Sequence, residues 1–140
     1  MKQILRTFLF LMVALVAVVS CGDEPDGKWD KMQWTNVNNL MNVNGVYLFP
    51  EESGSYTFLC RNYDRPWIES VIVNGVPQAV DNEDRFQFNG EWFTLNFEGN
   101  KLIINVKELP ESVESRSFDL NVTAGDIFDT LNFSQKKNSY

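Results

Sequence analysis

Histidine is absent from the 140 residues, and its absence limits the chemistry that the chain can perform. Ser-His and Cys-His catalysis and His-based metal sites are excluded, because each of them needs an imidazole. Carboxylates cluster at Glu51-Glu52, at Glu83-Asp84 and among Glu108, Glu111 and Glu114. Each cluster lies in a predicted turn or loop, whereas the two carboxyl groups of a glycosidase face each other across a cleft. The sequence therefore predicts no catalytic residues and no enzyme.

One acidic loop is a candidate for a metal site. Asp81-Asn82-Glu83-Asp84 offers carboxylate and amide oxygens, the ligands that Ca²⁺ prefers. The loop lacks the ligand spacing and the glycine of an EF-hand. We interpret it as a solvated loop and predict neither a metal nor a cofactor.

Three aromatic side chains, Tyr63, Trp67 and Trp92, are the candidate ligand-binding residues. The C–H face of a sugar ring is apolar and packs on a flat aromatic side chain, while its hydroxyls bind amides and carboxylates. Trp67 begins a predicted strand shortly after Cys60, an arrangement that favours a core position in an immunoglobulin-like domain.

Trp92 is the foremost of the three candidates. It is opposite in phase to an alternating apolar series that we expect to face the core, so that Trp92 is expected to face the solvent. The series is Phe93, Leu95 and Phe97. The alternative is that Trp92 is covered by the segment 29–44.

The elements that position these side chains are short strands. Alternation of apolar and polar residues predicts strands at 46–49, 55–62, 67–73, 86–88, 93–97, 101–107, 117–123 and 131–135. Ala124-Gly125-Asp126 supplies a tight turn, in which glycine permits a positive φ. Cys60 is in phase with Phe58 and is expected to be a buried small apolar residue. Seven or eight strands at this spacing predict an all-β, antiparallel, immunoglobulin-like β-sandwich.

The segment 29–44 is harder to assign. Met32 and Trp34 alternate as in an edge strand, whereas Trp34, Val37 and Met41 would also share a helix face. Because asparagine is frequent here and disfavours a helix, we expect an extended segment with Trp29 and Trp34 packed against the domain.

The chain begins with a predicted signal peptide, residues 1–20. Lys2 and Arg6 precede the apolar run Phe8–Val19, whose twelve residues would rise only about 18 Å as a helix, too short to span a bilayer. Val18-Val19-Ser20-Cys21 resembles the bacterial lipobox, in which the cysteine is lipidated and becomes the first residue. Cys21 is therefore the predicted lipidation site, and the chain divides into 1–20, a tether and lead-in at 21–44, and the sandwich at 45–140.

The net charge of the chain argues against nucleic acids as partners, and the acidic residues after Cys21 indicate where the protein is located. Removal of residues 1–20 takes away two of the 12 basic residues and none of the 19 acidic ones, which leaves a net charge of about −9. Such a surface repels phosphate backbones, so nucleic-acid binding is not expected. The acidic residues after Cys21 resemble the surface-export signal of Bacteroidota lipoproteins. We expect an outer-membrane lipoprotein displayed on the cell surface, with a periplasm-facing position as the alternative.

The closing strands resemble those of the BACON family. The resemblance rests on Ser115 to Asp126, which contains Arg116-Ser117-Phe118, and on a last strand that ends in Gln135. Asn62 followed by Trp67, and Trp92 before Phe93, match two aromatic landmarks of the family. The likeness spans 45–137 and implies an immunoglobulin-like sandwich, exported and frequently found beside glycan-degrading enzymes.

Two functions follow from these expectations. In the first, the domain binds glycan or mucin through exposed aromatic side chains. The alternative is a structural or interaction lipoprotein without sugar affinity, which docks a protein partner at the cell surface and exposes an apolar patch.

Overall fold

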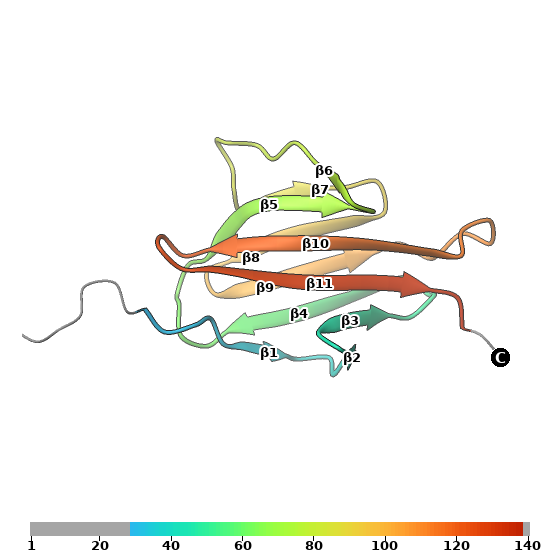
Figure 1. The fold of residues 1–140 in the computed structure, drawn as a ribbon, viewed down its shortest axis with the longest axis horizontal. Helices are drawn as coiled ribbons and strands as arrows, with labels where there is room; N and C mark the ends of the chain where they lie inside the picture. Colours follow the sequence, from blue (N-terminus) through green and yellow to red (C-terminus); the bar gives the residue numbers. More distant parts are fainter. Residues whose placement is uncertain (1–28, 139–140) are drawn as a thin grey trace, which may run out of the picture.

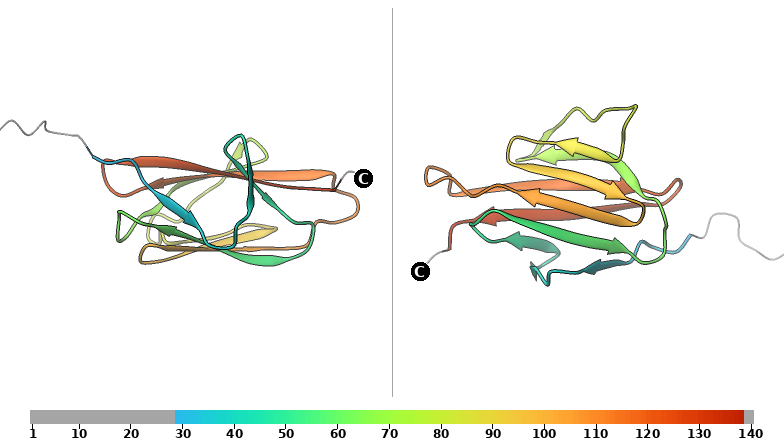
Figure 2. Two further views of the ribbon diagram at one scale, coloured as in Figure 1. Left: turned by 90° about the horizontal axis from the view of Figure 1, so that it is seen from below. Right: turned by 180° about the vertical axis from the view of Figure 1, so that it is seen from behind.

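The computed structural model describes residues 29–138, which form two β-sheets lying face to face (Figures 1 and 2). The eleven strands are β1 (Trp34–Asn36), β2 (Met41–Val43), β3 (Val46–Phe49), β4 (Gly54–Cys60), β5 (Trp67–Val73), β6 (Val76–Pro77), β7 (Gln87–Asn89), β8 (Phe93–Glu98), β9 (Lys101–Val106), β10 (Ser115–Thr123) and β11 (Phe128–Lys136). This part of the chain holds no helix, and hence none that could cross a membrane. The predicted signal peptide and the lipidation predicted at Cys21 lie outside the described residues.

The order of the strands is that of an immunoglobulin-like domain. One sheet runs β1-β4-β9-β8-β7 and the other runs β2-β3-β11-β10-β5-β6. Strands β1, β4, β9 and β8 follow the order A, B, E and D of the immunoglobulin fold, and β11, β10 and β5 follow the order G, F and C. The predicted immunoglobulin-like β-sandwich is therefore confirmed.

Two strands, β2 and β6, were not foreseen from the sequence, and each has two or three residues at the edge of a sheet. Strands this short contain too few residues for an alternation to be recognised. β1, also an edge strand, lies where Met32 and Trp34 indicated one. Neighbouring strands pair antiparallel except for β3 and β11, which run parallel.

The segment 29–44 supplies one edge strand to each sheet. β1 pairs with β4 in one sheet and β2 pairs with β3 in the other, so this segment is extended as expected. Trp34 is half-buried and packs near Phe97, with ring centroids 6.4 Å apart. Trp29, by contrast, is 59% exposed, and the expectation that it packs against the domain is wrong. No strand includes Trp29, so no main-chain pairing holds it against the sandwich.

A row of phenylalanine rings joins the two sheets. Phe93 of β8 stacks on Phe118 of β10 with ring centroids 3.8 Å apart. Phe118 stacks on Phe133 of β11 at 4.8 Å, and Phe133 stacks on Phe49 of β3 at 5.3 Å. Because β8 and β10 belong to different sheets, the contact between Phe93 and Phe118 closes the sandwich.

Glycine and asparagine occupy the turn positions that have a positive φ. Gly125 has φ +96°, which confirms the predicted tight turn between β10 and β11. Asn44-Gly45 and Asn74-Gly75 connect β2 to β3 and β5 to β6, with positive φ at both residues of each pair. Two consecutive positive φ values define the type I′ turn, whose twist matches that of the strands it joins.

Cys60 lies in the core, as the sequence predicted. Its side chain is 1% exposed. Among residues 29–138 it has no disulfide partner. Its thiol lies 3.7 Å from the side-chain oxygen of Asn62. Burial among apolar side chains is the environment in which a cysteine acts as a small hydrophobic residue.

Phe118→Ala should lower the free energy of unfolding by about 3 to 5 kcal/mol, because Phe118 is 1% exposed and its removal leaves a cavity between the sheets. The same change at Phe128, which is 64% exposed, is the matched control and should cost less than about 0.5 kcal/mol. Urea denaturation followed by circular dichroism measures both. Equal losses in the two variants would contradict the assignment of Phe118 to the central stack.

Candidate ligand-binding site

Trp92 does not face the solvent, so the prediction that it does is wrong. The side chain is 7% exposed and packs edge-on against Phe93 and Phe118, at centroid distances of 4.7 and 5.5 Å. Trp92 lies in the turn before β8, where strand alternation no longer fixes which face a side chain occupies. Its carbonyl accepts a hydrogen bond from the Lys107 amide at 2.8 Å, which folds the turn onto the core. These contacts cover Trp92, rather than the segment 29–44.

Arg116 lies over the ring of Trp92. Its guanidinium carbon is 4.5 Å from the centroid of the indole ring, and the side chain is 9% exposed. Nε donates to Oε1 of Gln135 at 2.7 Å, and Nη2 donates to the carbonyls of Lys107 and Glu108 at 2.9 and 2.8 Å. Burial lowers the pKa of the Arg116 guanidinium from its ordinary value.

Gln135 completes this buried polar cluster. It is 0% exposed, and its Nε2 donates to the carbonyls of Pro50, Glu51 and Lys107 at 2.9, 3.3 and 3.1 Å. Arg116 and Gln135 face each other in the register of β10 and β11. Arg116 and Gln135, on which the family resemblance partly rests, therefore bond to the β3–β4 and β9–β10 connections, and Arg116 also contacts Trp92 in the turn between β7 and β8. They offer no surface to a ligand.

Tyr63 and Trp67 are both half-buried and occupy different places. The Tyr63 hydroxyl donates to the carbonyl of Asp30, so that the loop between β4 and β5 holds the start of the described chain. Desolvation raises the pKa of Tyr63, and the charges of Asp30 and Cys60 add to the rise. Trp67 begins β5 opposite Thr123 of β10. It is Ile68, 0% exposed, that fills the core at this point.

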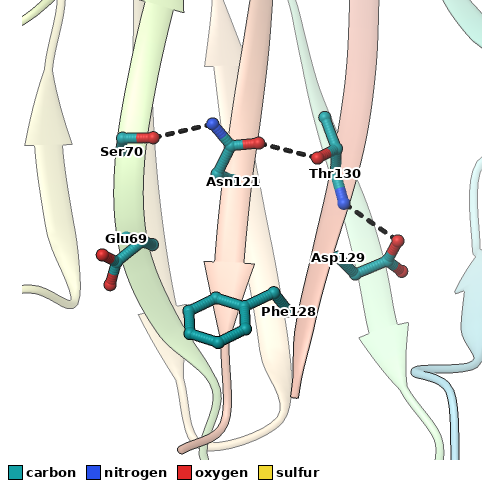
Figure 3. A pocket seen from close by; sticks show the side chains of 6 residues that line it. All are labelled: Glu69, Ser70, Asn121, Phe128, Asp129 and Thr130. Carbon is teal, nitrogen blue, oxygen red and sulfur yellow. Dashed lines mark hydrogen bonds between the residues drawn. The ribbon is translucent and has the colours of Figure 1, made fainter. Parts of the chain in front are cut away.

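A groove of about 390 Å³ lies elsewhere, on the outer face of the sheet that contains β5, β10 and β11. It is lined by Glu69, Ser70, Asn121, Phe128, Asp129 and Thr130. Figure 3 shows the ring of Phe128 below Asn121, with Glu69 to one side and Asp129 to the other. None of the three aromatic residues singled out in the sequence lines this groove.

An irregularity in β5 supplies one wall of the groove. Ser70 pairs with Asn121, yet Ile68 pairs with the next residue of β10, Val122, so the register shifts at Glu69. Such a β-bulge adds one residue to a strand and turns its side chains away from strict alternation. Glu69 and Ser70 accordingly lie side by side at the groove, between two core residues, Ile68 and Val71, that are each 0% exposed.

A row of hydrogen bonds crosses three strands along the floor of the groove. Thr130 Oγ1 donates to Asn121 Oδ1, and Asn121 Nδ2 donates to Ser70 Oγ, each at 2.7 Å (Figure 3). A linked row holds its side chains in fixed orientations, because each bond orients the next group. The floor is therefore polar and pre-organised.

Asp129 is fixed by two donors. Its Oδ1 accepts from the amide of Thr130 and its Oδ2 accepts from the indole Nε1 of Trp34, both at 2.9 Å. The second bond joins β11 to β1, which belong to different sheets. Both carboxylate oxygens of Asp129 are thus already hydrogen-bonded within the chain.

Phe128 adds a flat apolar surface to this polar floor. It is the first residue of β11 and is 64% exposed. An exposed phenylalanine alone is ordinary, but this ring lines the same groove as two carboxylates, an amide and two hydroxyls. Pockets that bind small ligands combine an apolar surface with a few oriented polar groups in this way.

The sequence contains two signals that point to this site. Phe128 is out of phase with Leu131, Phe133 and Gln135, so the reasoning applied to Trp92 would have placed Phe128 outside. Glu69 and Ser70 are two successive polar residues between apolar neighbours, a pattern typical of a bulge. What alternation could not indicate is that these residues of β5 and β11 share one groove.

A metal centre has no support among residues 29–138, where no three of the side chains that bind metals cluster. The acidic loop at 81–84 is held by bonds of its own. Asp81 Oδ1 accepts from the amide of Glu83, and Asp84 Oδ1 accepts from that of Phe86.

Comparison with known proteins places the chain in a family. A protein from Bacteroides thetaiotaomicron, solved by NMR, is 34% identical to this chain, which aligns over 85% of its own length and 98% of the length of that protein, with a TM-score of 0.68. The chain belongs to the family of this Bacteroides protein. No protein-family model matches the chain, so the resemblance to the BACON family stays a prediction, and no curated protein matches either.

Domains of titin also align with the chain. The M1 domain is 14% identical over 76% of this chain and 93% of that domain, with a TM-score of 0.42. The M4 domain is 7% identical over 79% of this chain and 100% of that domain, with a TM-score of 0.43.

Arg116→Met is expected to lower the free energy of unfolding by about 2 to 4 kcal/mol, because the amide of Gln135 and two main-chain carbonyls lose a buried donor. Arg61→Met is the matched control, since Arg61 is exposed, and should change stability little. The double variant Arg116→Met, Gln135→Met should cost less than the sum of the two single changes. Thermal and urea unfolding measure these effects, and an unaltered stability of Arg116→Met would refute the role of the cluster.

Proposed function

We propose that this chain is a non-catalytic, lipid-anchored domain of the cell surface that binds glycan in the groove beside Phe128. The observation that carries the proposal is the position of the exposed Phe128 ring alongside the hydrogen-bonded row Thr130-Asn121-Ser70, next to Asn121 in the middle of the row (Figure 3). The C–H face of a pyranose would pack on the ring, and its hydroxyls would bind the row and Glu69. Mucin glycans are among the ligands that such a site would accept.

The groove suits binding better than hydrolysis. Glycoside hydrolysis needs one carboxyl group that gives up a proton and a second that acts as nucleophile or base. Both oxygens of Asp129 already accept hydrogen bonds from Trp34 and Thr130, and Glu69 lies 3.6 Å from Arg85. Asp129 therefore has no oxygen without a hydrogen-bond partner, and the two carboxylates of the groove have different surroundings.

Attachment at Cys21 would fit this role. A short acidic tether would hold the sandwich close to the outer surface of the membrane, where several acyl chains make anchoring lasting. A module held in this way would gather glycan near the cell. A BACON-type identity would agree with the same function.

A second candidate function is the docking of a protein partner on β2. Met41 and Val43 are 67% and 45% exposed, and in the register of β2 and β3 they lie opposite Leu48 and Val46. Tyr47 and Phe49 of β3 contact the core ring of Phe133. The four aliphatic side chains, here called the β2–β3 patch, therefore occupy the outer face. An extended partner segment could add a strand beside β2, which is a sheet edge.

Phe128→Ala is expected to weaken glycan binding by about tenfold or more, because packing roughly 60 Å² of apolar surface on a sugar contributes about 1.5 kcal/mol. The soluble chain 22–140 contains the whole described sandwich, and an array of host and plant glycans followed by calorimetry of the hits measures its binding. Trp29→Ala is the matched control, since Trp29 is similarly exposed and lies outside the groove.

Three outcomes separate the two functions. Loss of binding in Phe128→Ala, with Trp29→Ala unchanged, supports the glycan site. An array without any hit, from protein shown to be folded, refutes it. A protein partner whose binding is lost in Met41→Asp and kept in Phe128→Ala would support the β2–β3 patch instead.

A further inference from the structure

We propose that Glu69 makes the groove selective for uncharged glycans and against glycans that carry sulfate or uronic acid groups. This inference rests on the proposed function and adds the ligand class. Of the six residues that line the groove, two are carboxylates and none is a cation. A sulfate or carboxylate on the ligand would therefore meet negative charge at the groove without a positive partner in its lining.

The bulge in β5 gives Glu69 this position. In a regular strand Glu69 would have an opposite residue on β10, but the register passes from Ser70–Asn121 to Ile68–Val122 and leaves Glu69 unpaired. Its side chain is 45% exposed and lies at the groove beside Ser70. The extra residue thus adds a carboxylate at the end of the polar row.

Glu69 differs from Asp129, the other carboxylate of the groove. Both oxygens of Asp129 accept hydrogen bonds from Trp34 and Thr130. Glu69 has one partner, Arg85, whose Nη1 lies 3.6 Å from its Oε2. Since that distance exceeds hydrogen-bond length, both oxygens of Glu69 can accept hydroxyl groups of a ligand.

The direction of the polar row supports the same preference. Thr130 donates to Asn121, and Asn121 donates to Ser70, so the Ser70 hydroxyl keeps its hydrogen for another acceptor. A neighbouring pair of sugar hydroxyls matches this end of the groove, because one hydroxyl accepts from Ser70 and the other donates to Glu69. An anionic group can accept from Ser70 but can donate nothing to Glu69.

Arg85 moderates the charge of Glu69 from outside the groove. Its other nitrogen, Nη2, donates to Oδ1 of Asn82 at 2.8 Å, which holds the guanidinium on the loop before β7. Arg85 does not line the groove, and its side chain is 34% exposed. It therefore orients Glu69, and removing it should strengthen the selectivity against anions.

The test compares each neutral glycan that binds with the same glycan after sulfation, using laminarin, xylan, mannan and N-acetyllactosamine oligomers as probes. At about 0.01 M salt the wild-type chain should bind the sulfated form about tenfold more weakly, and the ratio should shrink at about 0.15 M, where the screening length falls to roughly 8 Å. Glu69→Gln keeps the shape of the side chain and should reduce the ratio to about threefold or less. Arg85→Gln should increase it.

Glu91→Gln is the matched control, because Glu91 is an exposed carboxylate in the turn between β7 and β8 and lies outside the groove. It should leave the ratio unchanged. Equal binding of neutral and sulfated probes, or a ratio that Glu69→Gln does not alter, overturns the selectivity while the glycan-binding function stands. Binding of sulfated probes alone overturns it as well, and binding of no probe refutes both proposals.

Discussion

A buried cation without a carboxylate partner governs how this sandwich closes. Arg116 is the one charged side chain that residues 29–138 bury, and no acid neutralises it. Its Nε donates to the amide oxygen of Gln135, its Nη2 donates to the carbonyls of Lys107 and Glu108, and its guanidinium lies over the ring of Trp92. Because an unsatisfied buried charge is very costly, these groups must all be in place at once.

The cluster links parts of the chain that are distant in sequence. Gln135 is on β11, its amide group donates to carbonyls at residues 50 and 51 after β3, and Arg116 reaches the connection between β9 and β10. These contacts hold together elements of both sheets at one end of the sandwich. The phenylalanine row begins beside it, since Trp92 also packs against Phe93 and Phe118. The polar cluster at the end of the fold and the aromatic packing in its middle therefore share Trp92.

Strands β10 and β11 hold the buried cluster on their inner face and part of the groove on their outer face. Along β10 and β11, inward residues such as Leu120, Leu131 and Phe133 alternate with outward residues such as Asn121 and Thr130. The two faces of a strand can have different roles, since successive side chains point in opposite directions. Changes on the outer face can alter binding while the inner face keeps the fold, which makes this sheet suitable for a binding site.

The sequence by itself determined the fold class and most of the strands. Period-two alternation places β3 and β5 at their observed bounds, Gly125 marks the turn between β10 and β11, and Cys60 lies inside as its phase indicated. These features depend on local patterns, which a sequence displays directly. The tertiary structure decided which aromatic side chains are covered. Trp92 is buried because Arg116 and Phe118 lie against it, whereas Phe128 stays exposed at the start of β11. Only the pairing of β5, β10 and β11 brings Glu69, Asn121 and Phe128 into one groove, because register between distant strands is set by their packing and is not encoded in any one segment.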